Sequence, residues 1–267
     1  MKSDIWFDDH EQDYDQLDPI HACLKAEQRW LAITNVRKYL QILDDLVVEA
    51  KQIVSACSTK HEALDTIVDH FYSDWTFSGT SQKIEETKLN SLSYSLVYRT
   101  GTDLPLALIL KHVLFNLDFD VCIVVFESSL MLNVKMSQDE GYLIDPASGQ
   151  QSWYLKPENL SVEENSDSFQ IVPEDNLYKL FLAHQKWAFI SENKHYQALN
   201  CIELLMTITG DDPYERRDRG YLLRSINCSQ MAREDLEYFI SECPDDPAIE
   251  LIQNQLEEME NNINTIH

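Results

Sequence analysis

The chain has 267 residues, of which 44% are hydrophobic and 25% are charged, the composition of an ordinary globular protein. Its 46 acidic and 21 basic residues give a net charge of −25, which argues against nucleic acid and anionic membranes as partners. The longest apolar runs, 104–110 and 121–126, are far shorter than the roughly 20 residues of a membrane-spanning helix. The acidic N-terminus is the opposite of a secretion signal, so we expect a cytoplasmic protein.

Motifs for metals and cofactors are missing from the sequence. The six cysteines form no CxxC pair, the eight histidines form no HxxxH pair, and the six glycines form neither GxGxxG nor GxxxxGK. We therefore expect no metal and no cofactor, and we expect the cysteines to be reduced.

The first part of the chain is predicted to be helical. Residues 1–18 are acidic, with Trp6 and Phe7 as their main apolar content, and are predicted to form a loosely held arm. Apolar residues then recur every three or four positions from Val36 to Cys57, which predicts one long amphipathic helix. A second helix is predicted over 61–72, followed by a polar surface loop over 73–89.

The middle of the chain combines a buried helix with β-prone runs. Pro105 stands where a first helical turn would begin, and residues 106–110 are all apolar, which predicts a central helix. The runs FDVCIVVF, SSLMLNVKM and GYLIDPASGQ then predict an antiparallel meander. A helix on such a sheet is an α+β unit, which we place in residues 19–165. The polar segment 156–175 is interpreted as a linker.

An internal repeat occupies the last part of the chain. Asp-Asp-Pro occurs at 211–213 and again 34 residues later at 245–247, and Ala198 and Ala232 have the same spacing. This is the period of the tetratricopeptide repeat, in which each unit is a pair of helices. We therefore predict an all-α repeat domain in residues 174–267, with helices over 176–191, 194–208, 213–226, 229–242 and 247–261. Asp212 and Asp246, each followed by proline, are the predicted N-caps of two helices.

The repeat also shows where the first unit departs from the pattern. Gly220 and Pro244 lie twelve residues before and after Ala232, which matches the small-residue and terminating positions of the repeat. In the first unit Lys186 replaces the glycine and Gly210 replaces the proline.

Taken together, these motifs resemble the bacterial SirB-type invasion-regulator family. The resemblance rests on LNSLSYSLVYRTGTDLPLAL, YLIDPASGQ and DDPYERRDRGYLLRSINC, and it extends from about Pro19 to the end. It implies a fold of class α+β, with a helical N-terminal part and a central helix on a small antiparallel sheet, as in transglutaminase-like and papain-like proteins. An all-α module of tetratricopeptide-like repeats follows.

The resemblance also implies that the catalytic triad has been lost. Active transglutaminase-like enzymes use a cysteine at the start of the central helix, a histidine on the sheet and an aspartate beyond it. Here residues 103–117 contain no cysteine, serine or threonine, and Ser129 stands where the histidine would lie. Only Asp145 keeps a triad residue type. Ser129 and Asp145 are therefore vestigial positions, and no catalytic residue is assigned.

Two alternatives stay open at these positions. Cys122 and His112 offer a relocated cysteine–histidine pair, although a buried thiol and a core histidine are the more common roles for such residues. Asp145 is expected to cap backbone amides in the turn that follows its strand.

Four arginines stand out in the acidic repeat region: Arg216, Arg217, Arg219 and Arg224. One interpretation is ordinary helix pairing, Asp212 with Arg216 and Glu215 with Arg219, four residues apart. The other is a clamp in which guanidinium groups hold carboxylates of a partner protein or of the neighbouring domain.

The sequence therefore predicts a non-catalytic transglutaminase-like protein that acts as an interaction or regulatory module, with an unidentified protein partner. An enzyme with a non-standard active site and a purely structural subunit are the alternatives. The oligomeric state is not predicted.

Overall fold

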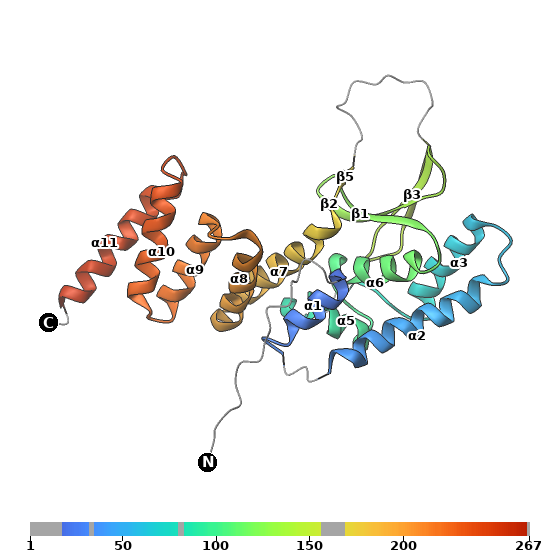
Figure 1. Ribbon diagram of the computed structural model, residues 1–267, viewed down its shortest axis with the longest axis horizontal. Coiled ribbons are helices and arrows are strands. Elements are labelled where there is room, and N and C mark those ends of the chain that lie inside the picture. Colours follow the sequence, from blue (N-terminus) through green and yellow to red (C-terminus); the bar gives the residue numbers. More distant parts are fainter. Residues whose placement is uncertain (1–17, 32–34, 80–82, 156–168, 266–267) are drawn as a thin grey trace, which may run out of the picture.

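The computed structural model describes residues 18–31, 35–79, 83–155 and 169–265, with side chains up to Met259. An α/β body lies at one end, and helices of the C-terminal region extend away from it (Figure 1). The predicted fold class, an α+β domain followed by repeat helices, is confirmed.

Among the residues that the structure describes, six helices precede the sheet, and the two predicted by periodicity are present. The helices are α1 (Pro19–Glu27), α2 (Val36–Val54), α3 (Lys60–Ser73), α4 (Glu86–Leu89), α5 (Leu92–Tyr98) and α6 (Asp103–Phe115). The segment predicted as a surface loop differs from the prediction. Phe77 is fully buried and stacks on Phe71 with 4.3 Å between ring centroids, because residues 75–78 bond to the backbone of α3 and of Arg99 after α5.

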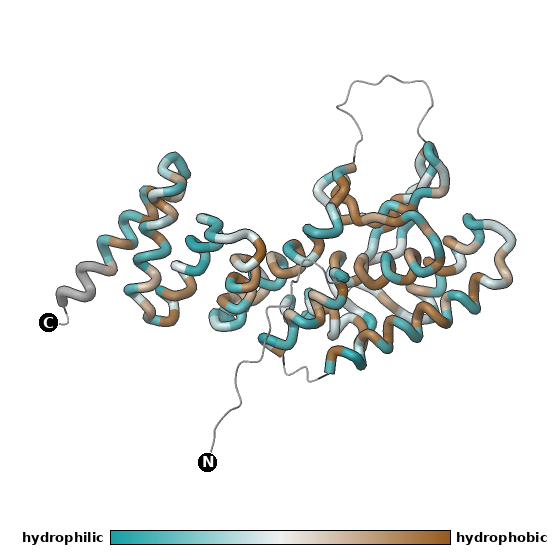
Figure 2. Tube along the Cα trace, viewed as in Figure 1, coloured by the Kyte–Doolittle hydropathy of each residue, from teal (hydrophilic) through white to brown (hydrophobic). Residues whose placement is uncertain are grey.

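Helix α6 is the centre of the α/β body. Every side chain from Leu104 to Leu110 is buried, so the helix is apolar on all faces rather than along one stripe. Figure 2 shows this apolar character along the α6 trace.

The sheet has five antiparallel strands in the order β4-β3-β2-β1-β5. They are β1 (Asp120–Phe126), β2 (Ser129–Lys135), β3 (Glu140–Ile144), β4 (Gln151–Leu155) and β5 (Gln170–Ile171). The first three coincide with the predicted β-prone runs. The two edge strands were not predicted, and β5 lies inside the segment that was interpreted as a linker. Val121, Ile123 and Leu132 join the α6 side chains in one core.

The C-terminal helices follow the predicted repeat closely. They are α7 (Glu174–Ser191), α8 (His195–Thr209), α9 (Pro213–Ser225), α10 (Ser229–Glu242) and α11 (Ile249–Thr265). The side chain of Asp212 accepts hydrogen bonds from the amides of Tyr214 and Glu215, as predicted for an N-cap. The prediction for Asp246 was wrong: its side chain accepts from the amide of Ala248, but residues 246–248 form a turn and α11 begins only at Ile249.

The first repeat pair is anchored on the α/β body, whereas the later helices are not. Leu177 and Phe181 of α7 and Leu205 of α8 belong to the same apolar core as α6. The later helices instead bury small clusters of their own, such as Leu236, Phe239 and Ile252.

Candidate functional site

The N-terminal end of α6 is where the triad nucleophile would lie, and Asp103 is the first residue of this helix. Burial raises the pKa of the Asp103 carboxyl, and the charge of Asp145 raises it further, whereas His184 lowers it. Asp103, Asp145, His184 and the hydroxyl of Tyr72 are therefore ionisable groups at this helix end, and none of them is a cysteine thiol.

Asp145 directly follows β3, and both of its carboxylate oxygens are engaged locally. Oδ1 accepts from the amide of Ala147 at 2.9 Å, and Oδ2 accepts from the hydroxyl of Ser148 at 2.6 Å. The hydroxyl of Tyr72 donates to the carbonyl oxygens of Asp145, at 3.3 Å, and of Pro146, at 2.9 Å. The predicted capping role of Asp145 is thus confirmed, and its carboxylate orients the turn between β3 and β4.

Ser129 is an exposed residue at the start of β2, opposite Phe126 across a tight turn. In the register of β2 and β3, Leu132 faces Ile144, so Asp145 lies level with Met131. Ser129 is therefore two residues, or about 7 Å, further along the strand. No hydrogen bond joins Ser129 to Asp145 among the residues that the structure describes.

The alternative pair of Cys122 and His112 is separated by the sheet. Val121 and Ile123 point into the core with α6, so Cys122 between them faces the opposite side. There the amide group of Asn133 donates to the Cys122 Sγ at 3.8 Å. Burial raises the pKa of the Cys122 thiol and lowers that of the His112 imidazole, so both neutral forms are favoured. This arrangement does not form a thiolate–imidazolium pair.

His184 is the member of this region that sequence reasoning missed. It lies on α7, and burial lowers the pKa of its imidazole while the charge of Asp103 raises it. No spacing in the sequence could have revealed it, because it belongs to the C-terminal helices and meets α6 only in the folded chain.

The arginines of α9 divide into two groups. Arg216 and Arg219 both bond Asp235 of α10, with Nε to carboxylate distances of 2.9 and 2.7 Å. The side chain of Asp235 is only 2% exposed. The expected pairs four residues apart, Asp212 with Arg216 and Glu215 with Arg219, are thus replaced by pairs between neighbouring helices.

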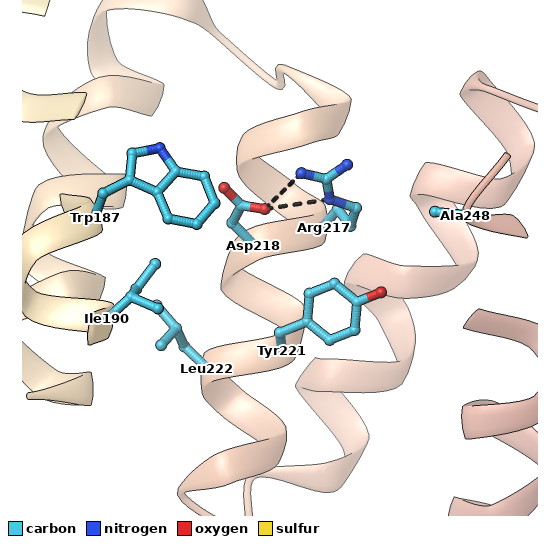
Figure 3. Close-up of a pocket in the computed structure, with 7 residues that line it drawn as sticks. All are labelled: Trp187, Ile190, Arg217, Asp218, Tyr221, Leu222 and Ala248. Carbon is cyan, nitrogen blue, oxygen red and sulfur yellow. Dashed lines mark hydrogen bonds and ion pairs between the residues drawn. The ribbon is translucent and has the colours of Figure 1, made fainter. Parts of the chain in front are cut away.

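Arg217 and Arg224 lie on a different face of the same helix. Arg217 donates twice to Asp218 Oδ1, at 3.2 and 2.9 Å, beside a hollow of about 300 Å³ (Figure 3). Trp187 and Tyr221 also line this hollow, from α7 and α9. Arg224 bonds Glu258 of α11 at 3.1 Å.

A buried lysine joins α7 to α9. Lys186 Nζ lies 2.9 Å from Glu215 and 2.8 Å from Asp218, and its side chain is 4% exposed. Lys186 occupies the repeat position of Gly220, whose added Cβ would lie 2.9 Å from Leu236 Cγ. The first unit therefore replaces close helix packing with a charge cluster.

Two further features of the described residues bear on function. No cluster of three or more histidine, cysteine, aspartate or glutamate residues is placed to hold a metal ion in the part that the structure describes. None of the described helices is long and apolar enough to cross a membrane.

Two family models match the chain. Residues 37–175, slightly more than half of the chain, match the transglutaminase-like superfamily, and residues 185–257 match the tetratricopeptide repeat. The first match ends just inside α7, and the second runs from α7 into α11.

Relatives from several bacteria match over most of the chain. Protein SirB1 of Salmonella typhimurium is 30% identical over 80% of this chain and 82% of its own length. UPF0162 protein YchA of Escherichia coli K12 is 28% identical over 80% and 82%, and UPF0162 protein BU173 of Buchnera aphidicola is 28% identical over 96% and 97%. No solved structure matches. The chain therefore belongs to the SirB1 family of transglutaminase-like proteins with tetratricopeptide repeats.

Proposed function

We propose that this protein is a cytoplasmic interaction or regulatory module whose transglutaminase-like domain has no acyl-transfer activity. The observation that carries the proposal is the N-terminal end of α6. A cysteine–histidine–aspartate enzyme needs a nucleophile there, and this chain has Asp103 followed by apolar residues. Without a nucleophile or an adjacent imidazole on β2, Asp145 alone cannot perform acyl transfer.

A transglutaminase assay with an amine donor and a glutamine-containing peptide tests this proposal. We expect no turnover above the rate without protein. Turnover that disappears in a Cys122→Ser variant would overturn the proposal, because Cys122 is the cysteine considered as a relocated nucleophile. Cys228, which is exposed, supplies the control variant Cys228→Ser.

The arginine run of α9 is the proposed site for an acidic partner. Because Asp235 fixes Arg216 and Arg219, their orientation is set before a partner arrives. About a fifth of each side chain is exposed, and the Arg216 guanidinium lies over the ring of Tyr238 at 4.1 Å. Guanidinium N–H groups not used by Asp235 are thus available for a second carboxylate.

The partner test has to preserve the repeat helices. Charge reversal of Arg216 and Arg219 would place three carboxylates together, so the variant Arg216→Gln/Arg219→Gln/Asp235→Asn is preferable. We expect a cytosolic partner captured by the wild type to be lost from this variant at unchanged helicity. The control is Arg233→Gln on α10, outside the run. Equal capture by all three proteins would exclude the arginines as the site.

One observation favours a second candidate, an enzyme with a non-standard site. The charge of Asp145 raises the pKa of the Asp103 carboxyl at the start of α6, and the charge of Asp103 in turn raises the pKa of the His184 imidazole. A carboxylate and an imidazole could serve as acid and base for a hydrolytic reaction. An activity screen with wild type and His184→Gln decides this: any turnover that requires His184 favours the enzyme.

A further inference from the structure

A second hollow lies between the α/β body and the first repeat pair. It has a volume of about 500 Å³ and is lined by three parts of the chain: Trp30 and Leu31 after α1 together with the start of α2, the region of α4 and α5, and the helices α7 and α8. It is separate from the start of α6 and from the arginines of α9. We call it the interdomain groove. Ligand sites are common at such junctions between domains.

Aromatic rings form the apolar surface of the interdomain groove. Trp30 meets Phe189 edge to face, with 5.8 Å between their ring centroids, and this contact joins the two domains. Tyr94 stacks on Tyr98 at 4.4 Å, and Tyr98 is 63% exposed. An aromatic or large aliphatic side chain would therefore find apolar partners here.

Two buried polar atoms in the interdomain groove have no partner among the described residues. Gln185 is 1% exposed, and its Nε2 donates to the carbonyl oxygen of Thr87, but its Oε1 accepts no hydrogen bond. The indole Nε1 of Trp30 is also buried and donates to no acceptor. The groove thus offers one acceptor and one donor, which are the complements of the N–H and C=O groups of a peptide backbone.

The rim of the interdomain groove is basic, which is unusual in a chain with 46 acidic and 21 basic residues. Three lysines line the groove, Lys38, Lys88 and Lys194, against one carboxylate, that of Glu85. No carboxylate pairs with Lys38 in the part of the chain that the structure describes. Lys88 and Lys194 are both paired with Glu85.

We propose that the interdomain groove binds an extended segment of a partner protein in which an aromatic side chain is flanked by acidic residues. The aromatic side chain packs on the rings, the backbone satisfies Gln185 and Trp30, and the acidic residues face Lys38 at the rim. This inference rests on the proposed binding function, but it uses no residue of α9 and does not depend on the absence of catalysis.

Fluorine NMR of the full chain tests the proposal directly. All five tryptophans are replaced by 5-fluorotryptophan, and the Trp30 signal is assigned with a Trp30→Phe variant. The probe is the synthetic peptide Asp-Asp-Glu-Phe-Asp-Glu-Asp. We expect a saturable shift of the Trp30 signal, and no shift with a peptide that has alanine in place of phenylalanine.

Two matched variants on α2 test the basic rim. Lys38→Glu is expected to weaken peptide binding about fivefold, because it replaces an attraction with a repulsion at the groove. Lys51→Glu makes the same change at an exposed position near the other end of the helix, and binding should be unchanged. The signals of the other tryptophans verify that both variants are folded.

Three results would overturn the proposal. The first is a Trp30 signal that does not respond to the peptide, and the second is equal weakening by Lys38→Glu and Lys51→Glu. The third is a Trp30 signal that moves only when residues 2–17 are deleted, which would assign the groove to this chain's own acidic segment. Capture of a partner through α9 is measured separately, so failure here and failure of the proposed function are distinguishable.

Discussion

The α/β body and the repeat helices bury their interiors with different chemistry. Helix α6 buries an unbroken apolar run, and its neighbours in the sheet are apolar too. Helix α9 instead buries Asp218 beside Lys186, and its arginines reach the buried Asp235 of α10. Apolar burial stabilises roughly in proportion to area, whereas a buried charge is tolerated only with its partner.

This difference has a consequence for function. Helix α6 is packed with apolar side chains from Leu104 onward, so its first turn carries Asp103 but no cysteine, serine or threonine. The repeat helices keep charged groups that are fixed but partly exposed, and these are suited to recognising a charged partner.

The largest effect should follow the loss of one charge in the repeat helices. Lys186→Met leaves Glu215 without its cation and Asp218 with Arg217 alone, and we expect a loss of about 4 kcal/mol in unfolding free energy. The variant Lys186→Met/Glu215→Gln/Asp218→Asn should recover most of this loss. Urea unfolding measures both, with Lys179→Met as an exposed control on α7. If the triple variant is as unstable as the single one, packing rather than charge explains the effect.

A truncation in the α/β body sharpens the contrast. Ile109→Ala on α6 should lower the unfolding free energy by about 3 kcal/mol, because it leaves a cavity in the core. Unlike the loss in Lys186→Met, this loss should not be recovered by neutralising a neighbouring charged residue. Phe115→Ala, at a position that is 66% exposed, provides the control at the end of the same helix. A loss of similar size in the control would refute the assignment of α6 as the centre of the core.

The α/β body also buries one ionisable group, the carboxyl of Glu27, which makes the stability of this otherwise apolar body depend on pH. Burial raises the pKa of Glu27 from 4.5 to about 7, although its carboxylate accepts from the amides of Leu92 and Ser93. The folded state therefore binds this proton more tightly than the unfolded state. The resulting stability is fully present below pH 4.5 and is lost as the pH rises through about 7.

Thermal unfolding of Glu27→Gln between pH 4.5 and pH 7.5 tests this dependence. The wild type should lose roughly 3 kcal/mol at most across this range through Glu27. The variant should show a flatter profile, at the cost of one hydrogen bond to the start of α5. Parallel profiles of the two proteins would show that Glu27 does not titrate there.

The smallest effect concerns the contact of α9 with α10. A methyl group at Gly220 would lie 2.9 Å from Leu236 Cγ and 3.2 Å from the carbonyl oxygen of Ala232. We expect Gly220→Ala to lower the melting temperature through a loss of about 1 kcal/mol, because steric overlap exceeds the gain in helix propensity. An increase in melting temperature would mean that α9 and α10 accommodate the added methyl group without a loss of stability.

The fold was largely predictable because its strongest signals are local or periodic. The run after Pro105 and the repeated Asp-Asp-Pro each identify helices without knowledge of their neighbours. The two short edge strands gave no such signal, since β5 has only two residues. The site was less predictable. The bond from Arg219 to Asp235 and the approach of His184 to α6 both join different helices, and hydrophobic periodicity does not show which helices will pack together. The capping role of Asp145 was predictable because it is confined to one turn.

The most direct test of the central claim is a transglutaminase assay on the full chain. Incorporation of a fluorescent primary amine into a glutamine-containing peptide should not exceed the rate without protein, in wild type and Cys122→Ser alike. Turnover by the wild type that is lost in Cys122→Ser and retained in Cys228→Ser would contradict the account, because it would show that this chain catalyses acyl transfer.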